Sequence, residues 1–344
     1  MSILSEDLSI IAKSVPHKFY NSTFFVTGAT GLIGSILIKG LLTCNKTYNS
    51  NIKIIALIRN EKKAFDIFSE YITDKLIFIK NDVTSQIKCS EPIDYIIHGA
   101  AQTASKEIIS FPVETSKTSI LGTFNIFDFA IEKNVKACLF LSSMEAFGIC
   151  NNNTTRLSET ELGKIDLSNI RSCYSESKRM CELLSKCYSS EFNIKFINAR
   201  LAQVFGAGLN KNENRVFAQF VKSAINNQDI ILHTDGTSWG NYCYTIDVIL
   251  ALFNILDKGI AGETYTVVNE ESSMMIKEMA KLIIDLSSSK SKLKFDIPND
   301  NTFGYAPKTI MKLSSAKLES LGWKPTVNLK EMFNRLIVSM KESL

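Results

Sequence analysis

The sequence predicts an α/β fold, in which helices cover both faces of a doubly wound parallel sheet. Short apolar runs alternate with longer segments of helical periodicity over the first 200 residues. The runs are almost continuously apolar, which is typical of parallel strands buried on both faces. We expect strands at residues 24–26, 51–58, 76–79, 93–97, 137–141 and 263–268, and long helices at 115–132 and 174–191.

A glycine-rich turn follows the first predicted strand. Gly28, Gly31 and Gly34 form a G-x-x-G-x-x-G pattern, one residue off the dinucleotide fingerprint G-x-G-x-x-G. Glycines permit a sharp turn and close approach to a ligand, while the N–H groups at a helix start attract phosphate. A tight strand-to-helix connection without a ligand is the alternative. We expect a dinucleotide to contact the following residues: Gly28, Thr30, Gly31, Leu32, Ile33 and Gly34.

The ends of the next three predicted strands extend the expected cofactor site. Arg59 ends the second strand, where a carboxylate binds the 2′-hydroxyl of NAD and an arginine accommodates the 2′-phosphate of NADP. Arg59 therefore favours NADP over NAD, although an ordinary exposed arginine is the alternative. Asp82 and Val83 follow the third strand, where an acidic side chain can reach the adenine. Ala100 and Ala101 follow the fourth and are small enough to let a cofactor pass.

Length and composition limit the classes of protein to consider. The 344 residues are 45% hydrophobic, enough for a large core and one or two domains. The net charge of +4 is scattered, so nucleic acid is not an expected partner. Neither a membrane span nor a signal peptide is expected, so we predict a cytoplasmic protein whose first residues form a short amphipathic helix. The eight cysteines lack metal-ligand spacing, so we expect free thiols and no metal.

Candidate catalytic residues follow the fifth predicted strand. Ser143 comes at its end, and Tyr174 and Lys178, at positions i and i+4, share one face of a helix. An ammonium group so placed favours the phenolate and lowers the tyrosine pKa, so that Tyr174 can act as a base. Ser143 can hydrogen-bond the same substrate oxygen. A tyrosine and a lysine at this spacing are by themselves common on solvent-exposed helices. Here the pair follows the glycine-rich turn and Ser143 in the chain, and this combination indicates catalysis.

Together these motifs resemble the extended short-chain dehydrogenase/reductase family, in its nucleotide-sugar epimerase/dehydratase group. Besides the turn, the serine segment and the Tyr174-x-x-x-Lys178 pair, the likeness rests on residues 198–206, 235–248 and 321–325. It implies a Rossmann-type domain and a smaller C-terminal substrate-binding domain. We expect residues 1–200 with about 241–270 in the first domain, and residues 207–240 with 271–344 in the second.

The resemblance also implies a reaction. In the family, the tyrosine removes a proton from a sugar hydroxyl while hydride passes to the nicotinamide, which gives a keto-sugar. Ser143, Tyr174 and Lys178 would be the catalytic residues, the last two also contacting the cofactor. Such enzymes serve nucleotide-sugar metabolism and polysaccharide biosynthesis. Many are homodimers, which here would pack the helices at residues 115–132 and 174–191.

Several positions depart from the family pattern. Dehydratases carry an Asp-Glu or Ser-Glu pair where this chain has Met144 and Glu145. Glu145 can serve as a second acid/base, or be a buried hydrogen-bonded carboxylate, but Met144 cannot protonate a leaving hydroxyl. Relatives have a diphosphate-binding arginine at the place of Gly240, and Arg215 is the candidate to bind the anion instead. Gln203 replaces a substrate-contacting asparagine. We thus expect substrate contacts from Gln203, Arg215 and Met144.

Three functions remain open on these grounds. The first is an NAD(P)-dependent epimerase or dehydratase that acts on a nucleotide-activated sugar through a keto-sugar. The second is an NADPH-dependent reductase of a keto-sugar nucleotide or a sugar phosphate, which would consume its cofactor stoichiometrically. The third is a non-enzymatic NAD(P)-binding sensor, against which the intact Tyr174–Lys178 pair argues.

Overall fold

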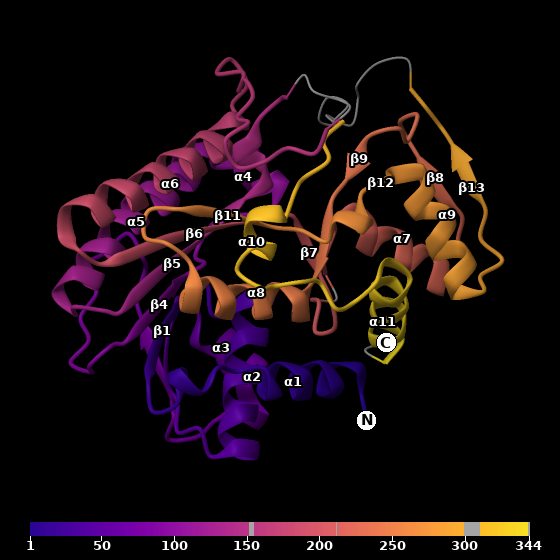
Figure 1. The fold of residues 1–344 in the computed structure, drawn as a ribbon. Coiled ribbons are helices and arrows are strands. Elements are labelled where there is room, and N and C mark those ends of the chain that lie inside the picture. Colours follow the sequence, from indigo (N-terminus) through magenta and orange to yellow (C-terminus); the bar gives the residue numbers. More distant parts are fainter. Residues whose placement is uncertain (151–154, 211, 299–309, 343–344) are drawn as a thin grey trace.

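A seven-stranded parallel sheet forms the centre of the computed structural model, which describes residues 1–150, 155–210, 212–298 and 310–342 (Figure 1). The strand order β3-β2-β1-β4-β5-β6-β11 runs outward from β1 in both directions. The predicted doubly wound sheet is therefore confirmed, and a crevice is expected where the order reverses, at the carboxyl ends of β1 and β4. The strands are β1 (Thr23–Thr27), β2 (Lys53–Ile58), β3 (Leu76–Lys80), β4 (Tyr95–His98), β5 (Ala137–Ser143), β6 (Lys195–Leu201) and β11 (Thr264–Val267).

Two strands start later than the sequence predicts. The second was expected from residue 51 but begins at Lys53, because Asn49 and Asn51 adopt left-handed backbone conformations. The fourth was expected at 93–97 but covers Tyr95–His98. Directly before it, the Asp94 carboxylate accepts a hydrogen bond from the Thr23 backbone N–H at 2.8 Å, which fixes the start of β4 beside β1.

Helices cover both faces of the sheet because successive strand side chains point to opposite sides. In β1, Phe24 and Val26 contribute to one core and Phe25 to the other. The first core is covered by α2 (Leu32–Tyr48), α3 (Glu61–Phe68) and α8 (Thr245–Lys258). The second is covered by α5 (Pro112–Glu132) and α6 (Ser172–Phe192), with the short α4 (Ser105–Ser110) beside α5.

A smaller group of elements lies to one side of the sheet (Figure 1). Three helices pack against one another: α7 (Val216–Ile225), α9 (Ile276–Ser287) and α11 (Leu329–Glu342). Three short strand pairs accompany them: β7 (Gln203–Phe205) with β10 (Tyr242–Tyr244), β8 (Ile230–Leu232) with β13 (Leu293–Phe295), and β9 (Trp239–Gly240) with β12 (Met274–Met275). The one-turn helix α10 (Ala316–Glu319) lies against β11. The apolar core is continuous between this group and the sheet.

The predicted N-terminal helix is confirmed as α1 (Ile3–Lys13), and it joins both groups of elements. It packs on α2, α8 and α11. The buried Asp7 accepts a hydrogen bond from the Tyr244 hydroxyl at 2.8 Å and another from Arg335 of α11 at 2.8 Å. One carboxylate of α1 thereby contacts β10 and α11 together.

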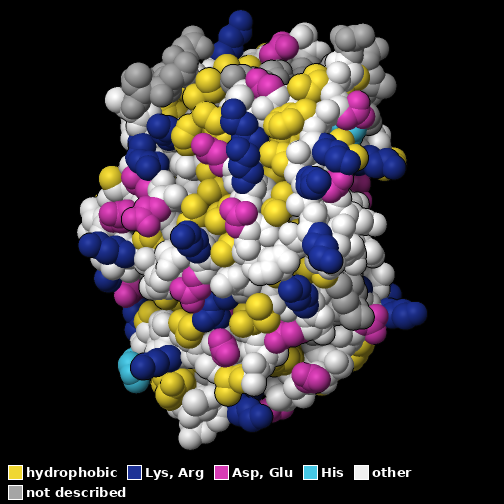
Figure 2. All heavy atoms as spheres, turned by 90° about the vertical axis from the view of Figure 1, so that its right-hand side faces the viewer, with side chains coloured by type: hydrophobic (Ala, Val, Ile, Leu, Met, Phe, Trp, Pro, Cys, Tyr) yellow, Lys and Arg dark blue, Asp and Glu magenta, His cyan; other side chains and the backbone are white. Residues whose placement is uncertain are grey.

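The surface carries both charged and apolar side chains. Figure 2 shows basic and acidic side chains interspersed among hydrophobic ones on the side that faces right in Figure 1. Within the described ranges, no helix combines the length and the apolarity that a bilayer span requires. The cysteines in this part of the chain are free thiols, as expected.

Candidate active site

The glycine-rich turn between β1 and α2 has no room for side chains at two positions. Gly28 has a φ of +69°, and a Cβ atom there would lie 2.5 Å from the carbonyl oxygen of Gly99. A Cβ atom at Gly34 would lie 2.4 Å from the carbonyl oxygen of Gly28. Helix α2 begins at Leu32, and its N-cap residue, Gly31, offers no side chain to cap the first N–H groups of the helix. This cradle of backbone donors fits a dinucleotide diphosphate.

The other predicted cofactor residues lie along one edge of the sheet, because adjacent parallel strands have their carboxyl ends at the same edge. Arg59 follows β2 and Asp82 follows β3, and their Nη1 and Oδ2 atoms are 3.8 Å apart. Burial alone would raise the pKa of Asp82, but hydrogen bonds from Thr84 and the charge of Arg59 lower it below its ordinary value. Val83 is buried in the core. Ala100 and its neighbour Ala101 follow β4.

A buried histidine fixes the backbone beside this edge. The Thr27 hydroxyl oxygen lies 2.7 Å from Nδ1 of His98 and accepts a hydrogen bond from the Ala100 N–H at 3.1 Å. Nε2 of His98 lies 3.2 Å from the Thr123 hydroxyl. Burial, with the nearby Lys178 charge, lowers the pKa of His98 to about 3, so its ring is neutral near pH 7. His98 is therefore a structural residue that positions Ala100.

The predicted catalytic residues lie together where β5 meets α6. Ser143 ends β5, while Tyr174 and Lys178 project from the first two turns of α6, and both are buried. Nζ of Lys178 donates to the Leu141 carbonyl at 2.7 Å and lies 5.7 Å from the centroid of the Tyr174 ring. A hydrogen bond joins Tyr174 to Ser143. The structure thus brings all three groups to one point.

Opposing charges act on Tyr174 and Lys178. Burial raises the pKa of Tyr174 above its ordinary value, and the Glu145 carboxylate raises it further. The Ser143 hydrogen bond and the charges of Arg171 and Arg215 lower it. Burial lowers the pKa of Lys178 to about 8, against the influence of Cys181 and Glu182. Near pH 7 Lys178 therefore keeps a positive charge beside Tyr174.

Glu145 is held by an arginine that the sequence analysis did not single out. Nη1 and Nη2 of Arg171 donate to its two carboxylate oxygens at 2.5 and 2.7 Å. The Ser175 hydroxyl is a third donor at 3.4 Å. Arg171 precedes Tyr174 by three residues, nearly one helical turn, so the spacing indicated that it lies near Tyr174 but not that it pairs with Glu145.

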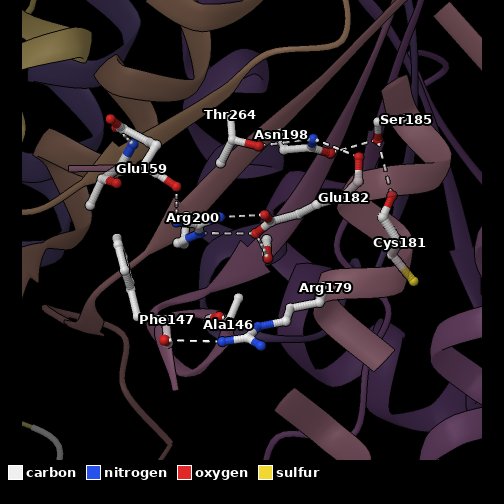
Figure 3. A network of polar contacts seen from close by, with 12 residues as sticks. Ala146, Phe147, Glu159, Arg179, Cys181, Glu182, Ser185, Asn198, Arg200 and Thr264 are labelled. Carbon is white, nitrogen blue, oxygen red and sulfur yellow. Dashed lines mark hydrogen bonds and ion pairs between the residues drawn. The ribbon is translucent and has the colours of Figure 1, made fainter. Parts of the chain in front are cut away.

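A buried ion pair ties the catalytic helix to the sheet (Figure 3). Arg200 of β6 donates to both oxygens of Glu182 on α6, at 3.1 and 2.5 Å, and its guanidinium lies 4.4 Å from the centroid of the Phe147 ring. The Ser142 hydroxyl donates to the same carboxylate at 2.5 Å. Glu182 follows Lys178 by four residues, so its side of the helix was predictable but its partner was not. This pair anchors α6 beside Ser143.

The predicted substrate-contacting residues lie in three separate segments of the chain. Gln203 begins β7 and is half-buried. Arg215 directly precedes α7, is 41% exposed, and donates to the Val204 carbonyl and to Glu213 at 3.2 and 2.8 Å. Its charge is one of the influences that lower the pKa of Tyr174. Met144 is partly buried against a small apolar cluster of residues including Phe147.

Comparison with known sequences identifies the family. A model of the NAD dependent epimerase/dehydratase family matches residues 24–269, which is more than half of the chain. The chain belongs to this family. The match begins in β1, includes the glycine turn and both catalytic segments, and ends after β11, so it covers every element that builds the site above.

Other members of the epimerase/dehydratase family align over most of the chain. UDP-glucuronic acid decarboxylase 6 of Arabidopsis thaliana is 27% identical over 328 residues, which cover 92% of this chain and 90% of that protein. UDP-glucuronic acid decarboxylase 1 of Danio rerio is 26% identical over 338 residues, which cover 96% of this chain and 76% of that protein.

Solved structures share the fold. UDP-N-acetylglucosamine 4-epimerase from Methanobrevibacter ruminantium superposes with a TM-score of 0.80 at 19% identity, over 94% of this chain and 99% of that one. UDP-glucuronic acid 4-epimerase from Bacillus cereus, solved with UDP-glucuronic acid and NAD, has a TM-score of 0.77 at 21% identity, over 94% and 100%. A nicotinamide cofactor thus suits both the family and the backbone cradle.

Proposed function

We propose that this protein is a nicotinamide-dependent epimerase or dehydratase that acts on a nucleotide-activated sugar through a keto-sugar intermediate. The observation that carries the proposal is the convergence of Ser143, Tyr174 and Lys178 at the end of β5. Their site shares a sheet edge with the glycine cradle of β1 and α2. The relatives named above act on UDP-linked sugars, and the family match supports the same class of substrate here.

Each residue of the trio has a defined role in this proposal. Bound in the cradle, a nicotinamide dinucleotide supplies reversible oxidation of an alcohol. The Tyr174 oxygen takes the proton of a sugar hydroxyl, which Ser143 orients by a hydrogen bond. Lys178 stabilises the phenolate with its charge and holds its own position through the Leu141 carbonyl. Low water access at the buried tyrosine strengthens both interactions.

We propose that Arg215 binds the anionic part of the substrate, with Gln203 and Met144 as neighbouring contacts. Gly240 offers no side chain for this purpose, whereas Arg215 is accessible and its charge lowers the pKa of Tyr174. Residues 207–240 and 271–344 would then form the substrate-binding domain, with residues 1–200 and about 241–270 as the cofactor domain. Arg215→Ala should raise KM more than it lowers kcat, because it removes binding common to the ground and transition states.

The second candidate is a net reductase of a keto-sugar nucleotide or sugar phosphate. Two observations favour it: Met144 cannot act as an acid, and both oxygens of Glu145 are occupied by Arg171. Glu145 can serve as a second acid/base only after one of those contacts opens. A reductase needs Tyr174 alone as its proton donor, so this geometry leaves that reaction intact.

For the cofactor, we infer a preference for NADP over NAD. Arg59 directly follows β2, where the adenosine ribose is held in this fold, and its side chain is 68% exposed. The nearby Asp82 partly offsets this charge. The test compares the Kd of NADPH and NADH by titration calorimetry in the wild type and in Arg59→Ala. The variant should lose about tenfold or more in NADPH affinity and little in NADH affinity; equal losses would contradict the inference.

We also propose a homodimer through α5 and α6. These adjacent helices expose apolar side chains, including Leu121 on α5 and Met180 and Leu183 on α6. A second copy of the chain would bury them by forming a four-helix bundle. Light scattering should give the mass of a dimer for the wild type and of a monomer for Leu183→Glu. A monomeric wild type would overturn the proposal.

The decisive experiment for the reaction combines two readouts. The protein is incubated with UDP-glucose, UDP-glucuronic acid, UDP-N-acetylglucosamine and the corresponding sugar phosphates, together with NAD or NADP in either redox state. Reduced cofactor is followed by absorbance and products by mass spectrometry and NMR. A new sugar without net cofactor change supports the epimerase or dehydratase, whereas stoichiometric oxidation of NADPH supports the reductase. Conversion that survives in Tyr174→Phe would contradict both.

A further inference from the structure

The two-point contact between Arg171 and Glu145 joins the two elements that carry the catalytic groups. Glu145 lies on the 3₁₀ turn η3 (Met144–Phe147) that directly follows β5, and Arg171 directly precedes α6. We propose that Arg171 is a positioning residue which, through its bidentate ion pair with Glu145, sets both the placement and the local charge of Tyr174. This proposal rests on the proposed role of Tyr174 as the base.

Each partner of the pair is one hydrogen bond away from a catalytic residue. The Glu145 backbone N–H donates to Oγ of Ser143 at 3.2 Å, and the Tyr174 N–H donates to the Arg171 carbonyl at 3.3 Å. The side-chain contact therefore closes a loop that runs from Ser143 through Glu145 and Arg171 to Tyr174. A bidentate guanidinium–carboxylate contact fixes orientation as well as distance, which one hydrogen bond does not.

The pair also balances charge next to the phenol. Glu145 raises the pKa of Tyr174 and Arg171 lowers it, so the two effects oppose each other while the pair is intact. Arg215, which directly precedes α7, also lowers the pKa of Tyr174, and Nζ of Lys178 on the same helix lies 5.7 Å from the centroid of the Tyr174 ring. Around Arg171, the facing groups are Glu145, Tyr174 and Cys173. Neutralising one partner of the pair should therefore shift the pKa of Tyr174 in the direction set by the charge of the partner that remains.

The pair also restrains Glu145 as a proton carrier. Its two oxygens accept from Arg171 and one of them also from Ser175, which leaves few lone pairs free for substrate. Both side chains remain near 30% exposed, so the contact is accessible to exchange rather than sealed in the core. Arg171 thus controls whether the Glu145 carboxylate is available.

The test follows the ionisation of Tyr174 without any sugar substrate. Five proteins are titrated by tyrosinate ultraviolet absorbance in the presence of saturating NAD: wild type, Glu145→Gln, Arg171→Gln, the double variant, and Glu176→Gln. Each is compared with its own Tyr174→Phe counterpart, so that the difference reports one phenol. Glu176 is the matched control, since it lies between Tyr174 and Lys178 in sequence but pairs with Arg179 at 3.9 Å. Urea unfolding checks that each variant is folded.

Opposite shifts are the expected result. Glu145→Gln leaves Arg171 unopposed and should move the Tyr174 midpoint down by about one pH unit, while Arg171→Gln should move it up by a similar amount. The midpoint of the double variant should lie close to that of the wild type, and Glu176→Gln should leave the midpoint unchanged. Equal midpoints throughout, or single variants that shift in the same direction, would overturn the proposal.

A second control separates placement from charge. Arg179 donates to the carbonyl oxygens of Ala146 and Gly163 at 2.7 and 2.6 Å, so Arg179→Gln loosens the same turn without touching Glu145. It should leave the midpoint unchanged. A shift as large as that of Arg171→Gln would assign the effect to general loosening and overturn the proposal. Because no turnover is measured, failure here is distinct from failure to find a substrate.

Discussion

Gly240 and Tyr242 compete for the same space. A Cβ atom at residue 240 would lie 2.2 Å from the hydroxyl oxygen of Tyr242 and 2.5 Å from Cζ of its ring. The ring is fully buried beside Phe205 and Phe333, and its hydroxyl has no hydrogen-bond partner within the described part of the chain. The departure from the family pattern is therefore not a simple deletion of an arginine. A tyrosine fills the volume that a side chain at residue 240 would need.

Gly240→Ala should consequently destabilise the protein. Overpacking a fully buried site costs about 1–3 kcal/mol, which urea unfolding measures. In a Tyr242→Phe background, the nearest clashing atom is absent, so the same substitution should cost less. A cost that is equal in the two backgrounds would show that the hydroxyl is not the obstacle.

Gly28→Ala should abolish dinucleotide binding. The change places a Cβ atom 2.5 Å from a carbonyl oxygen that belongs to the neighbouring strand end, and the left-handed backbone of residue 28 disfavours alanine. Gly31→Ala is the matched control, because its Cβ would meet its nearest neighbour at 3.2 Å. Calorimetric titration with NADH and NADPH should show loss of binding in the first variant and a smaller loss in the second. Similar affinities would contradict the cradle.

The buried pair Glu182–Arg200 should be far more sensitive to substitution than a surface pair. Glu182→Gln leaves a buried guanidinium without its counter-charge, and breaking such a pair costs about 3–5 kcal/mol of unfolding free energy. The control is Glu263→Gln, which removes a half-exposed partner of Lys317 and should cost less than about 1 kcal/mol. Comparable losses in urea unfolding would mean that the first pair is hydrated in solution.

Lys178 should make stability depend on pH in a defined window. Burial lowers its pKa to about 8 in the folded chain, so the unfolded chain binds this proton more tightly and the wild type gains stability as pH rises from about 8 to about 10.5. Lys178→Met lacks this gain. The difference in unfolding free energy between variant and wild type should therefore change by up to about 3 kcal/mol across the window, in favour of the wild type at high pH.

The control for that titration is Lys186→Met. Lys186 is exposed on the same helix, so its replacement should alter the unfolding free energy by less than about 0.5 kcal/mol at each pH. A flat difference for Lys178→Met would contradict the burial of its charge.

The sheet and the trio were predictable because their signals are local. Nearly continuous apolar runs mark buried parallel strands, and the i, i+4 spacing places Tyr174 and Lys178 on one helix face. The Arg171–Glu145 and Arg200–Glu182 contacts were not predictable, since each joins separate elements and depends on how α6 is rotated against β5. The glycine at position 240 was visible in the sequence, but the reason that no larger residue fits there became clear only from the position of Tyr242 in the structure.

Helix α1 links the first residues of the chain to β10 and α11, which are distant from it in sequence. Its Asp7 contacts Tyr244 of β10 and Arg335 of α11, which are separated from it by more than two hundred residues of sequence. An affinity tag or a truncation at this end would strain or remove that contact. Protein for crystallisation or assay should therefore carry its tag at the opposite terminus, since loss of α1 would loosen α11 and be misread as low intrinsic activity.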